Sequence, residues 1–83
     1  MARYKNEGKA LVHLPELTLG DRGYAVGWLQ AMLTIRGYHI PVETVRFFDN
    51  ATEKAVADYQ RDMGLTATGT VTAGTWAFLL MLE

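Results

Sequence analysis

The sequence predicts an all-α protein, a compact three-helix bundle with a repeated helix motif. Three segments carry apolar residues at helical spacing, each bounded by a capping residue or a glycine. The first two segments repeat one another. The repeated positions are Ala25, Val26, Leu29 and Gln30, then Ala55, Val56, Tyr59 and Gln60. A chain of 83 residues makes one domain, which we expect over residues 17–83, after a short N-terminal arm of residues 1–16.

The first helix is expected to begin after Asp21, whose carboxylate can accept a hydrogen bond from an N–H of the first turn. Its inward face is an apolar stripe made of Val26, Leu29 and Leu33. Gly37 suits the left-handed conformation that ends helices, and Tyr38 is expected to fold back on the last turn. Gly27 costs about 1 kcal/mol relative to alanine inside a helix, so it is either a close packing point or simply tolerated.

The second helix is expected to be capped by Asp49 and to end at Gly64, and Thr72 is expected to cap the third. The apolar line of the second helix consists of Thr52, Ala55, Val56, Tyr59 and Met63. That of the third consists of Trp76, Leu79 and Leu80. The segment 38–48 has β-branched residues, a proline and no helical period. It is therefore expected to form an ordered loop with a short extended piece.

The composition excludes several classes of function. A net charge of −1 without a run of basic residues argues against nucleic acid as a partner. No apolar stretch approaches the ~20 residues that span a bilayer, so no membrane span is expected. The first seventeen residues have scattered charges and no apolar central region, which is not typical of a signal peptide.

The side chains that carry most enzyme chemistry are missing. The sequence contains neither serine nor cysteine, which removes the two commonest nucleophiles. His13 and His39 lack the spacing of metal ligands. Asp58 and Asp62 could be read as a carboxylate pair, but a solvated helix face is the favoured interpretation. We therefore expect no catalytic residues, no metal and no cofactor.

Two stretches resemble the bacterial peptidoglycan-binding domain family. "GDRGYAVGWLQAML" is similar to its opening pattern G-x-x-G-x-x-V-x-x-L-Q-x-x-L. "FDNATEKAVADYQRDMGLTATGTVTAGTWAFL" resembles the second half, F-x-x-x-T-x-x-A-V-x-x-[FY]-Q-x-x-x-G-L-x-x-T-G-x-V-x-x-x-T-W-x-x-L. The resemblance covers residues 17–79 with correct internal spacing. It implies a three-helix domain whose first two helices are related repeats.

The repeated faces are expected to form the core. The stripe of the first helix can pack on that of the second, with Trp76 and Leu79 closing the core. Gln30 and Gln60, at equivalent places, are expected to turn their amides inward and satisfy backbone groups of the loops. The repeated face is therefore expected to be structural.

One loop departs from the family pattern. Many relatives carry Asp-Gly where this sequence has Val45 and Arg46, ahead of Phe47 and Phe48. Neither residue takes a positive φ cheaply, so we expect the loop to have a different geometry.

Candidate ligand-binding residues lie in the loops near the ends of the first two helices. Apolar sugar faces stack on aromatic rings, and the carboxylates of stem peptides pair with arginine. The candidates are Arg22, Tyr24, Tyr38, His39, Arg46 and Phe47. Trp28 lies off the inner stripe and is either a half-buried prop or part of the binding surface.

The resemblance implies a non-catalytic module that binds a glycan strand or stem peptide of peptidoglycan and tethers a linked hydrolase or phage endolysin. Such a module acts outside the cell, at the bacterial wall, or is released at lysis. The alternative is a protein–protein interaction or virion structural domain with the same fold. The apolar last helix favours this alternative. Its exposed face, with Phe78, Met81 and Leu82, would be covered either by Leu11, Val12 and Leu14 of the arm or by a neighbouring domain or subunit.

Overall fold

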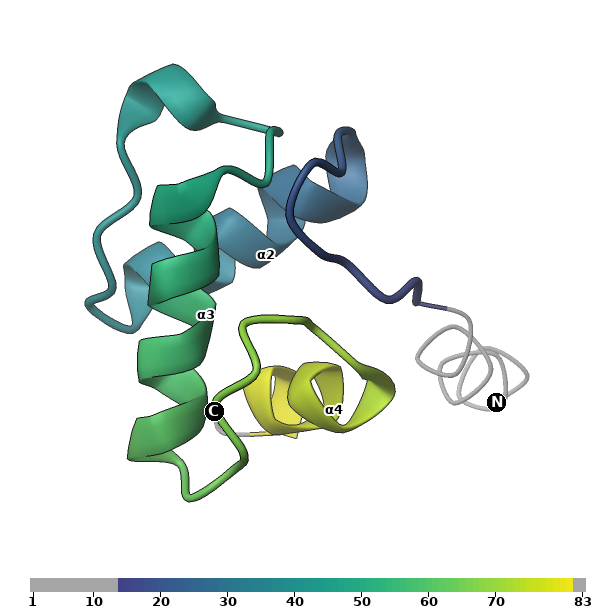
Figure 1. Cartoon of the computed structure of the whole chain (residues 1–83), viewed down its shortest axis with the longest axis vertical. Helices are drawn as coiled ribbons and strands as arrows, with labels where there is room; N and C mark the ends of the chain where they lie inside the picture. Colours follow the sequence, from purple (N-terminus) through teal and green to yellow (C-terminus); the bar gives the residue numbers. More distant parts are fainter. Residues whose placement is uncertain (1–13, 82–83) are drawn as a thin grey trace, which may run out of the picture.

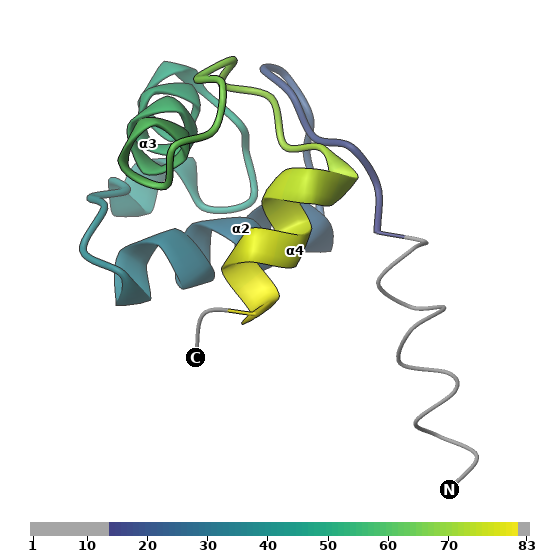
Figure 2. The same ribbon diagram turned by 90° about the horizontal axis from the view of Figure 1, so that it is seen from below.

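The computed structural model describes residues 14–81, which form three α-helices and one short 3-10 helix. The α-helices are α2 (Tyr24–Ile35), α3 (Asn50–Asp62) and α4 (Ala73–Met81). The 3-10 helix η1 (Val42–Thr44) lies in the loop between α2 and α3. The α-helices cross around a shared core rather than lying parallel (Figure 1 and Figure 2). The predicted all-α, three-helix domain is confirmed.

The start of α2 differs from the prediction. Asp21 does not cap the helix, because its Oδ2 accepts a hydrogen bond from the Thr18 N–H at 2.8 Å in a preceding turn. The N-cap is Gly23, which has a φ of 122° and no side-chain capping bond. The helix begins late because Arg22 forms an antiparallel bridge with Phe47, which keeps the backbone extended beyond Asp21.

The other predicted helix boundaries are confirmed. The Asp49 Oδ1 accepts a hydrogen bond from the N–H three residues on at 3.0 Å, and the Thr72 Oγ1 does the same at 3.4 Å. Gly37 and Gly64 follow α2 and α3 with φ values of 94° and 80°. The Tyr38 N–H donates to a carbonyl in the last turn of α2 at 2.9 Å.

The loop between α2 and α3 is ordered, as predicted, and its short extended piece is at Phe47, in the bridge to Arg22. The sequence did not predict η1. This turn is closed by the Thr44 N–H and hydroxyl, which both donate to the carbonyl of Pro41, at 3.1 and 2.9 Å.

The core lies where the three helices meet. Its buried apolar residues are Leu17, Val26, Leu29, Leu33, Phe48, Ala55, Val56, Tyr59, Val71, Trp76 and Leu79. Met63 and Leu80, also predicted to face inward, are only half-buried. Leu14 packs against the core, and the Trp76 Nε1–H donates to the Pro15 carbonyl at 2.8 Å. Phe78 is 37 % exposed. Leu11 and Val12, and the side chains of Met81 and Leu82, lie outside the described residues.

Gln30 of α2 turns its amide into the loop ahead of α3, as predicted. Its side chain is buried, with its Oε1 accepting a hydrogen bond from the Arg46 N–H at 2.8 Å. Its Nε2 lies 2.9 Å from the Thr44 carbonyl oxygen, 3.0 Å from that of Phe47 and 3.0 Å from the Thr52 hydroxyl. One amide therefore satisfies backbone groups that would otherwise be buried without partners.

Gln60 of α3 performs the same task in the loop ahead of α4. Its Oε1 accepts from the Gly69 N–H at 2.9 Å. Its Nε2 donates to the Thr70 carbonyl at 2.9 Å and the Thr75 hydroxyl at 3.0 Å. The repeat seen in the helices therefore continues into the loops that follow them.

We expect Gln60→Met to lower the free energy of unfolding by about 2 kcal/mol, because it keeps the side-chain length but leaves the buried Gly69 N–H without its acceptor and removes one of the two donors to the Thr70 carbonyl. Chemical denaturation measures this change. Arg61→Met on the same helix is the control, since it removes only an exposed ion pair with Asp58 and should cost less than about 1 kcal/mol. Equal stability of the two variants would contradict the role given to Gln60.

Candidate functional site

The N-terminal end of α2 and the loop ahead of α3 lie side by side. The Gly23 N–H donates to the Arg46 carbonyl at 3.0 Å, and the Phe48 N–H donates to the Asp21 carbonyl at 2.9 Å. Together with the Arg22–Phe47 bridge, these bonds align the two segments. Four of the six predicted site residues, Arg22, Tyr24, Arg46 and Phe47, are brought together in this way.

The four residues form two pairs of a cation over an aromatic ring. The Arg22 Cζ lies 4.2 Å from the centroid of the Phe47 ring, and the Arg46 Cζ lies 4.4 Å from that of Tyr24. Tyr24 is 79 % exposed, and both arginines are exposed. Among residues 14–81, neither guanidinium forms an ion pair with a carboxylate of the chain. Both guanidinium groups can therefore donate hydrogen bonds to an anionic group of a ligand.

Arg46 adopts a left-handed backbone conformation with a φ of 67°. The expectation that this residue would avoid a positive φ was wrong. Gln30 is the physical reason, because its Oε1 holds the Arg46 N–H in this conformation. Gly69, bonded in the same way to Gln60, has a φ of 80°. The loop thus keeps the geometry that glycine adopts at the second site, at a strain cost of about 1–2 kcal/mol.

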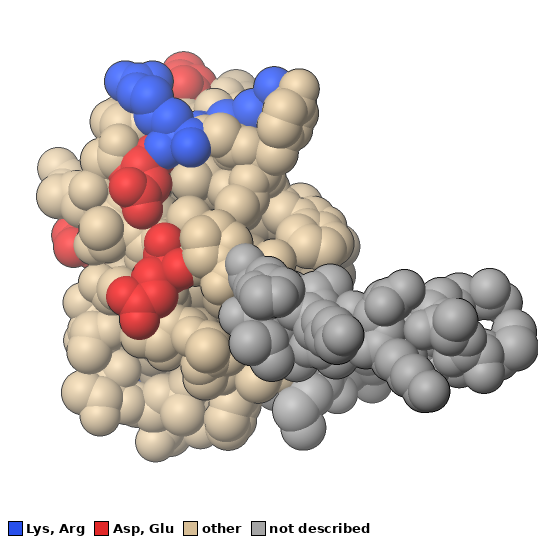
Figure 3. Space-filling model, turned by 90° about the vertical axis from the view of Figure 1, so that its right-hand side faces the viewer, with Lys and Arg blue, Asp and Glu red and all other residues tan. Residues whose placement is uncertain are grey.

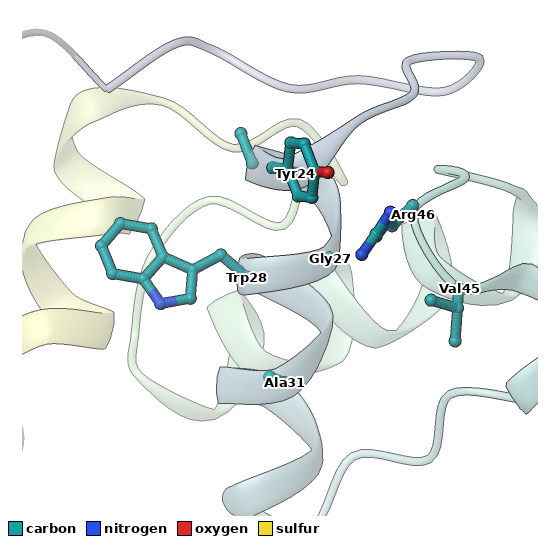
Figure 4. A pocket seen from close by; sticks show the side chains of 7 residues that line it. Tyr24, Gly27, Trp28, Ala31, Val45 and Arg46 are labelled. Atoms are coloured by element: carbon teal, nitrogen blue, oxygen red, sulfur yellow. The ribbon is translucent and has the colours of Figure 1, made fainter.

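A hollow of about 580 Å³ lies between Arg46 and the outer face of α2. Its lining residues are Tyr24, Ala25, Gly27, Trp28, Ala31, Val45 and Arg46. Figure 4 shows Tyr24 and Trp28 projecting from α2, Val45 and Arg46 coming from the loop, and the helix surface at Gly27 and Ala31 between them. On the face shown in Figure 3, Lys and Arg side chains gather towards one end, and several Asp and Glu side chains lie beside and below them on a mostly uncharged surface.

Gly27 is a close packing point, one of the two possibilities that its position in a helix left open. A Cβ atom at this residue would lie 3.1 Å from the Arg46 Cγ. The absence of a side chain therefore lets the stem of Arg46 lie against the helix.

Trp28 lies partly against the core and partly at the surface. Its ring centroid lies 6.3 Å from that of the buried Trp76, at an interplanar angle of 49°. The residue is nevertheless 54 % exposed and lines the hollow. One part of the indole therefore contacts the buried Trp76 ring, as expected of a half-buried prop, and the other part is exposed in the hollow.

Tyr38 and His39 lie elsewhere. They line a separate hollow of about 390 Å³ between the loop and α3, together with Lys54 and Asp58. The Tyr38 hydroxyl donates to the Asp62 Oδ2 at 2.5 Å, which with burial raises the pKa of Tyr38 to about 12. The Tyr38 ring also meets the Tyr59 ring edge-on at 5.7 Å. Tyr38 therefore has a structural role, whereas His39 is exposed.

The aliphatic part of the surface was not predicted from the sequence. A second hollow along α2, of about 480 Å³, adjoins the hollow at Arg46 and shares Gly27, Ala31 and Val45 with it. Ile35 and Val42 also line it and are about 80 % exposed. The signal was present in the sequence, because Tyr24, Trp28, Ala31 and Ile35 recur at helical spacing on the side of α2 opposite the core stripe.

Asp58 is an ordinary surface carboxylate. It lies 2.7 Å from the Lys54 Nζ and 2.8 Å from the Arg61 Nη1, and these two contacts lower its pKa. Within residues 14–81, no three acidic, histidine or cysteine side chains come close enough to hold a metal ion. No helix of this described part is both long and apolar enough to cross a membrane.

Residues 22–79 match the family model of the peptidoglycan binding domain. The chain therefore belongs to the peptidoglycan-binding domain family. No curated protein sequence matches it.

Three solved structures are similar to this fold, each with a TM-score of 0.74. A peptidoglycan-binding protein from Clostridioides difficile, solved with glutamine hydroxamate, is 32 % identical over 80 % of this chain and 40 % of its own. A Burkholderia AP3 phage endolysin is 35 % identical over 78 % of this chain and 24 % of its own. The SleB N-terminal domain is 25 % identical over 81 % of this chain and 90 % of its own. The chain thus spans less than half the length of the first two proteins.

Arg46→Gly should be more stable than Arg46→Ala by about 1 kcal/mol. Both variants lose the guanidinium, but only glycine adopts the left-handed conformation without strain. Thermal or chemical denaturation of the two variants gives the difference. Equal stabilities would show that the backbone at this residue is not strained.

Stability should fall as the pH rises through 10 towards 12. The fold raises the pKa of Tyr38 from 10.0 to about 12, so its contribution is complete below pH 10 and is lost as the phenol ionises. Alkaline absorbance titration should show that Asp62→Asn moves this ionisation down towards pH 10. Tyr38→Phe assigns the signal, and an unchanged titration in Asp62→Asn would contradict the role of Asp62.

Proposed function

We propose that this chain is a non-catalytic peptidoglycan-binding module that holds a linked cell-wall hydrolase, bacterial or phage-encoded, on the wall. Family membership supports binding, and the likeness to part of an endolysin supports the linked enzyme. A module of weak affinity is enough for this task, because tethering raises the effective concentration of the attached enzyme near its substrate. Such a protein works at the cell wall, either after export or after release at lysis.

We propose that the ligand lies against Arg22, Tyr24, Arg46 and Phe47, with Trp28 at the edge. The strained backbone of Arg46 carries this proposal. A residue held in a sparsely populated conformation at a cost in stability is a common sign of a functional site. Here the strain places the guanidinium above an exposed tyrosine, beside a hollow of suitable size. The partner is a glycan strand or a stem peptide of peptidoglycan.

The second candidate is a protein–protein interaction or virion structural domain. The exposed apolar side chains of Ile35 and Val42, which line one hollow, favour it, as does the exposed Phe78 of the apolar α4, because exposed apolar surface is typical of interfaces. A module of this kind would not be retained by purified peptidoglycan sacculi.

Retention on purified sacculi tests the first proposal. Arg46→Gly and Tyr24→Ala should each weaken retention several-fold, and added salt should weaken that of the parent, because an exposed cation is screened beyond about 10 Å at 0.1 M. Both side chains are exposed, so melting temperatures should stay within a few degrees of the parent. His39→Ala, another exposed loop residue, is the control and should be retained like the parent. No retention of the parent would reject the function, and unchanged retention of both variants would reject the site.

The proposal also requires that the chain itself leaves the wall intact. Incubation with sacculi should release no reducing sugar and no free amino groups above a buffer control. Release of either product would place a catalytic group in the chain and overturn the non-catalytic assignment.

A further inference from the structure

We infer that the two adjoining hollows along α2 take the stem peptide of peptidoglycan, with its carboxylates and short apolar side chains, rather than the sugar rings of the glycan strand. This inference rests on the proposed function and names the part of the polymer that is bound.

The two hollows form one continuous surface. The first ends and the second begins at Gly27, Ala31 and Val45, which line both. Their far ends are marked by Tyr24 and Ile35, eleven positions apart, or about 17 Å along a helix axis. An extended ligand can therefore occupy both hollows at once.

The side chains that line the second hollow offer a ligand few hydrogen-bonding groups. Its polar side chains are Gln30 and Thr34. The Gln30 amide is used by the loop ahead of α3, and the Thr34 hydroxyl donates to the Gln30 carbonyl at 2.8 Å. The remaining contacts are aliphatic, chiefly Ile35, Val42 and Val45. Sugar hydroxyls would lose their hydrogen bonds to water here without gaining new partners, which is costly. The burial of methyl groups in the same place is favourable.

The first hollow provides the complementary charge. Arg46 is fixed on three sides: Gln30 accepts from its N–H at 2.8 Å, Gly23 donates to its carbonyl at 3.0 Å, and its stem lies against Gly27. The guanidinium itself lies over the Tyr24 ring, with its Cζ 4.4 Å from the centroid, and presents a planar fork of donors that matches a carboxylate.

A carboxylate next to short apolar side chains is the chemical pattern of a stem peptide. Such peptides alternate alanine methyl groups with the carboxylates of glutamate and of the terminal residue. In the glycan strand the lactyl carboxyl groups of the muramic acid units are used in the amide bonds to the stem peptides, so the sugars present hydroxyl and N-acetyl groups and no carboxylate for Arg46. The charge of Arg46 in the first hollow and the apolar lining of the second hollow together therefore favour the stem peptide over the glycan strand.

Competition for retention on sacculi tests this inference. The competitors are the free stem tetrapeptide, the same peptide with its carboxylates converted to amides, and a neutral N-acetylglucosamine oligosaccharide. The free peptide should displace the chain, and the amidated peptide should need at least a tenfold higher concentration. The oligosaccharide should displace none. Displacement by the oligosaccharide, equal displacement by both peptides, or no displacement by the free peptide would overturn the inference.

A matched pair of variants tests the apolar part of the surface. The binding of a fluorescently labelled stem tetrapeptide to each variant is measured directly. Ile35→Gln should raise the Kd of this peptide several-fold, because it places a polar side chain in the second hollow. Leu19→Gln changes another exposed aliphatic residue that does not line either hollow and should have no effect. Equal effects of the two variants would overturn the placement. Loss of retention on sacculi by the parent chain would instead reject the proposed function itself, which separates the two failures.

Discussion

The loop ahead of α3 and the loop ahead of α4 both bring backbone groups into the interior of this protein, and a glutamine of the preceding helix satisfies them. Gln30 bonds the loop ahead of α3 and Gln60 the loop ahead of α4, and each reaches the threonine in the first turn of the next helix. A buried amide has both donors and an acceptor in one plane, which an apolar side chain of the same size cannot replace. The packing of three short helices depends on these two side chains, because none of the helices is long enough to be stable alone.

The first of these glutamines links the core to the candidate site. Its Oε1 determines the backbone conformation of Arg46, and Arg46 in turn covers the helix at Gly27. Substitution of Gln30 would therefore lower stability and also change the geometry of the candidate site, whereas substitution of Tyr24 removes only an exposed ring of that site. The second repeat has glycine at the place of Arg46, so it has the same loop geometry without a side chain to offer a ligand. The two repeats thus have the same structural role, but only the first presents a side chain at this loop position.

Much of the fold could be predicted from the sequence, because periodic apolar residues and local capping chemistry act over a few residues. The caps at Asp49 and Thr72, the glycines that follow α2 and α3, and the inward amides are of this kind. The Asp21 cap could not be judged locally, since the distant Phe47 holds the backbone extended at Arg22. The φ of Arg46 was missed for the same reason, because a tertiary hydrogen bond outweighs the intrinsic preference of the residue.

The candidate site was predicted only in part. The six residues shared a chemistry, aromatic or basic, and a place near helix ends, but the sequence could not show on which side of the loop each one lies. Arg46 lines the hollow beside the outer face of α2, whereas Tyr38 and His39 line the separate hollow beside α3. The apolar residues on the outer face of α2 form a second stripe in the sequence. An exposed apolar stripe and a core stripe have the same helical period, so the period alone could not show that this stripe is exposed.

The attachment of residues 15–18 to the last third of the chain has a mechanical consequence. Leu17 exchanges two backbone hydrogen bonds with Val71, at 3.0 and 2.8 Å, and the Pro15 carbonyl accepts from the indole of Trp76 at 2.8 Å. A pulling force that enters the domain at residue 14 therefore reaches Val71 and the buried Trp76 before it reaches α2. To detach this segment, the force must break both backbone bonds and the indole bond beside the core. These bonds therefore resist a load at the point where it enters the domain, before it reaches α2.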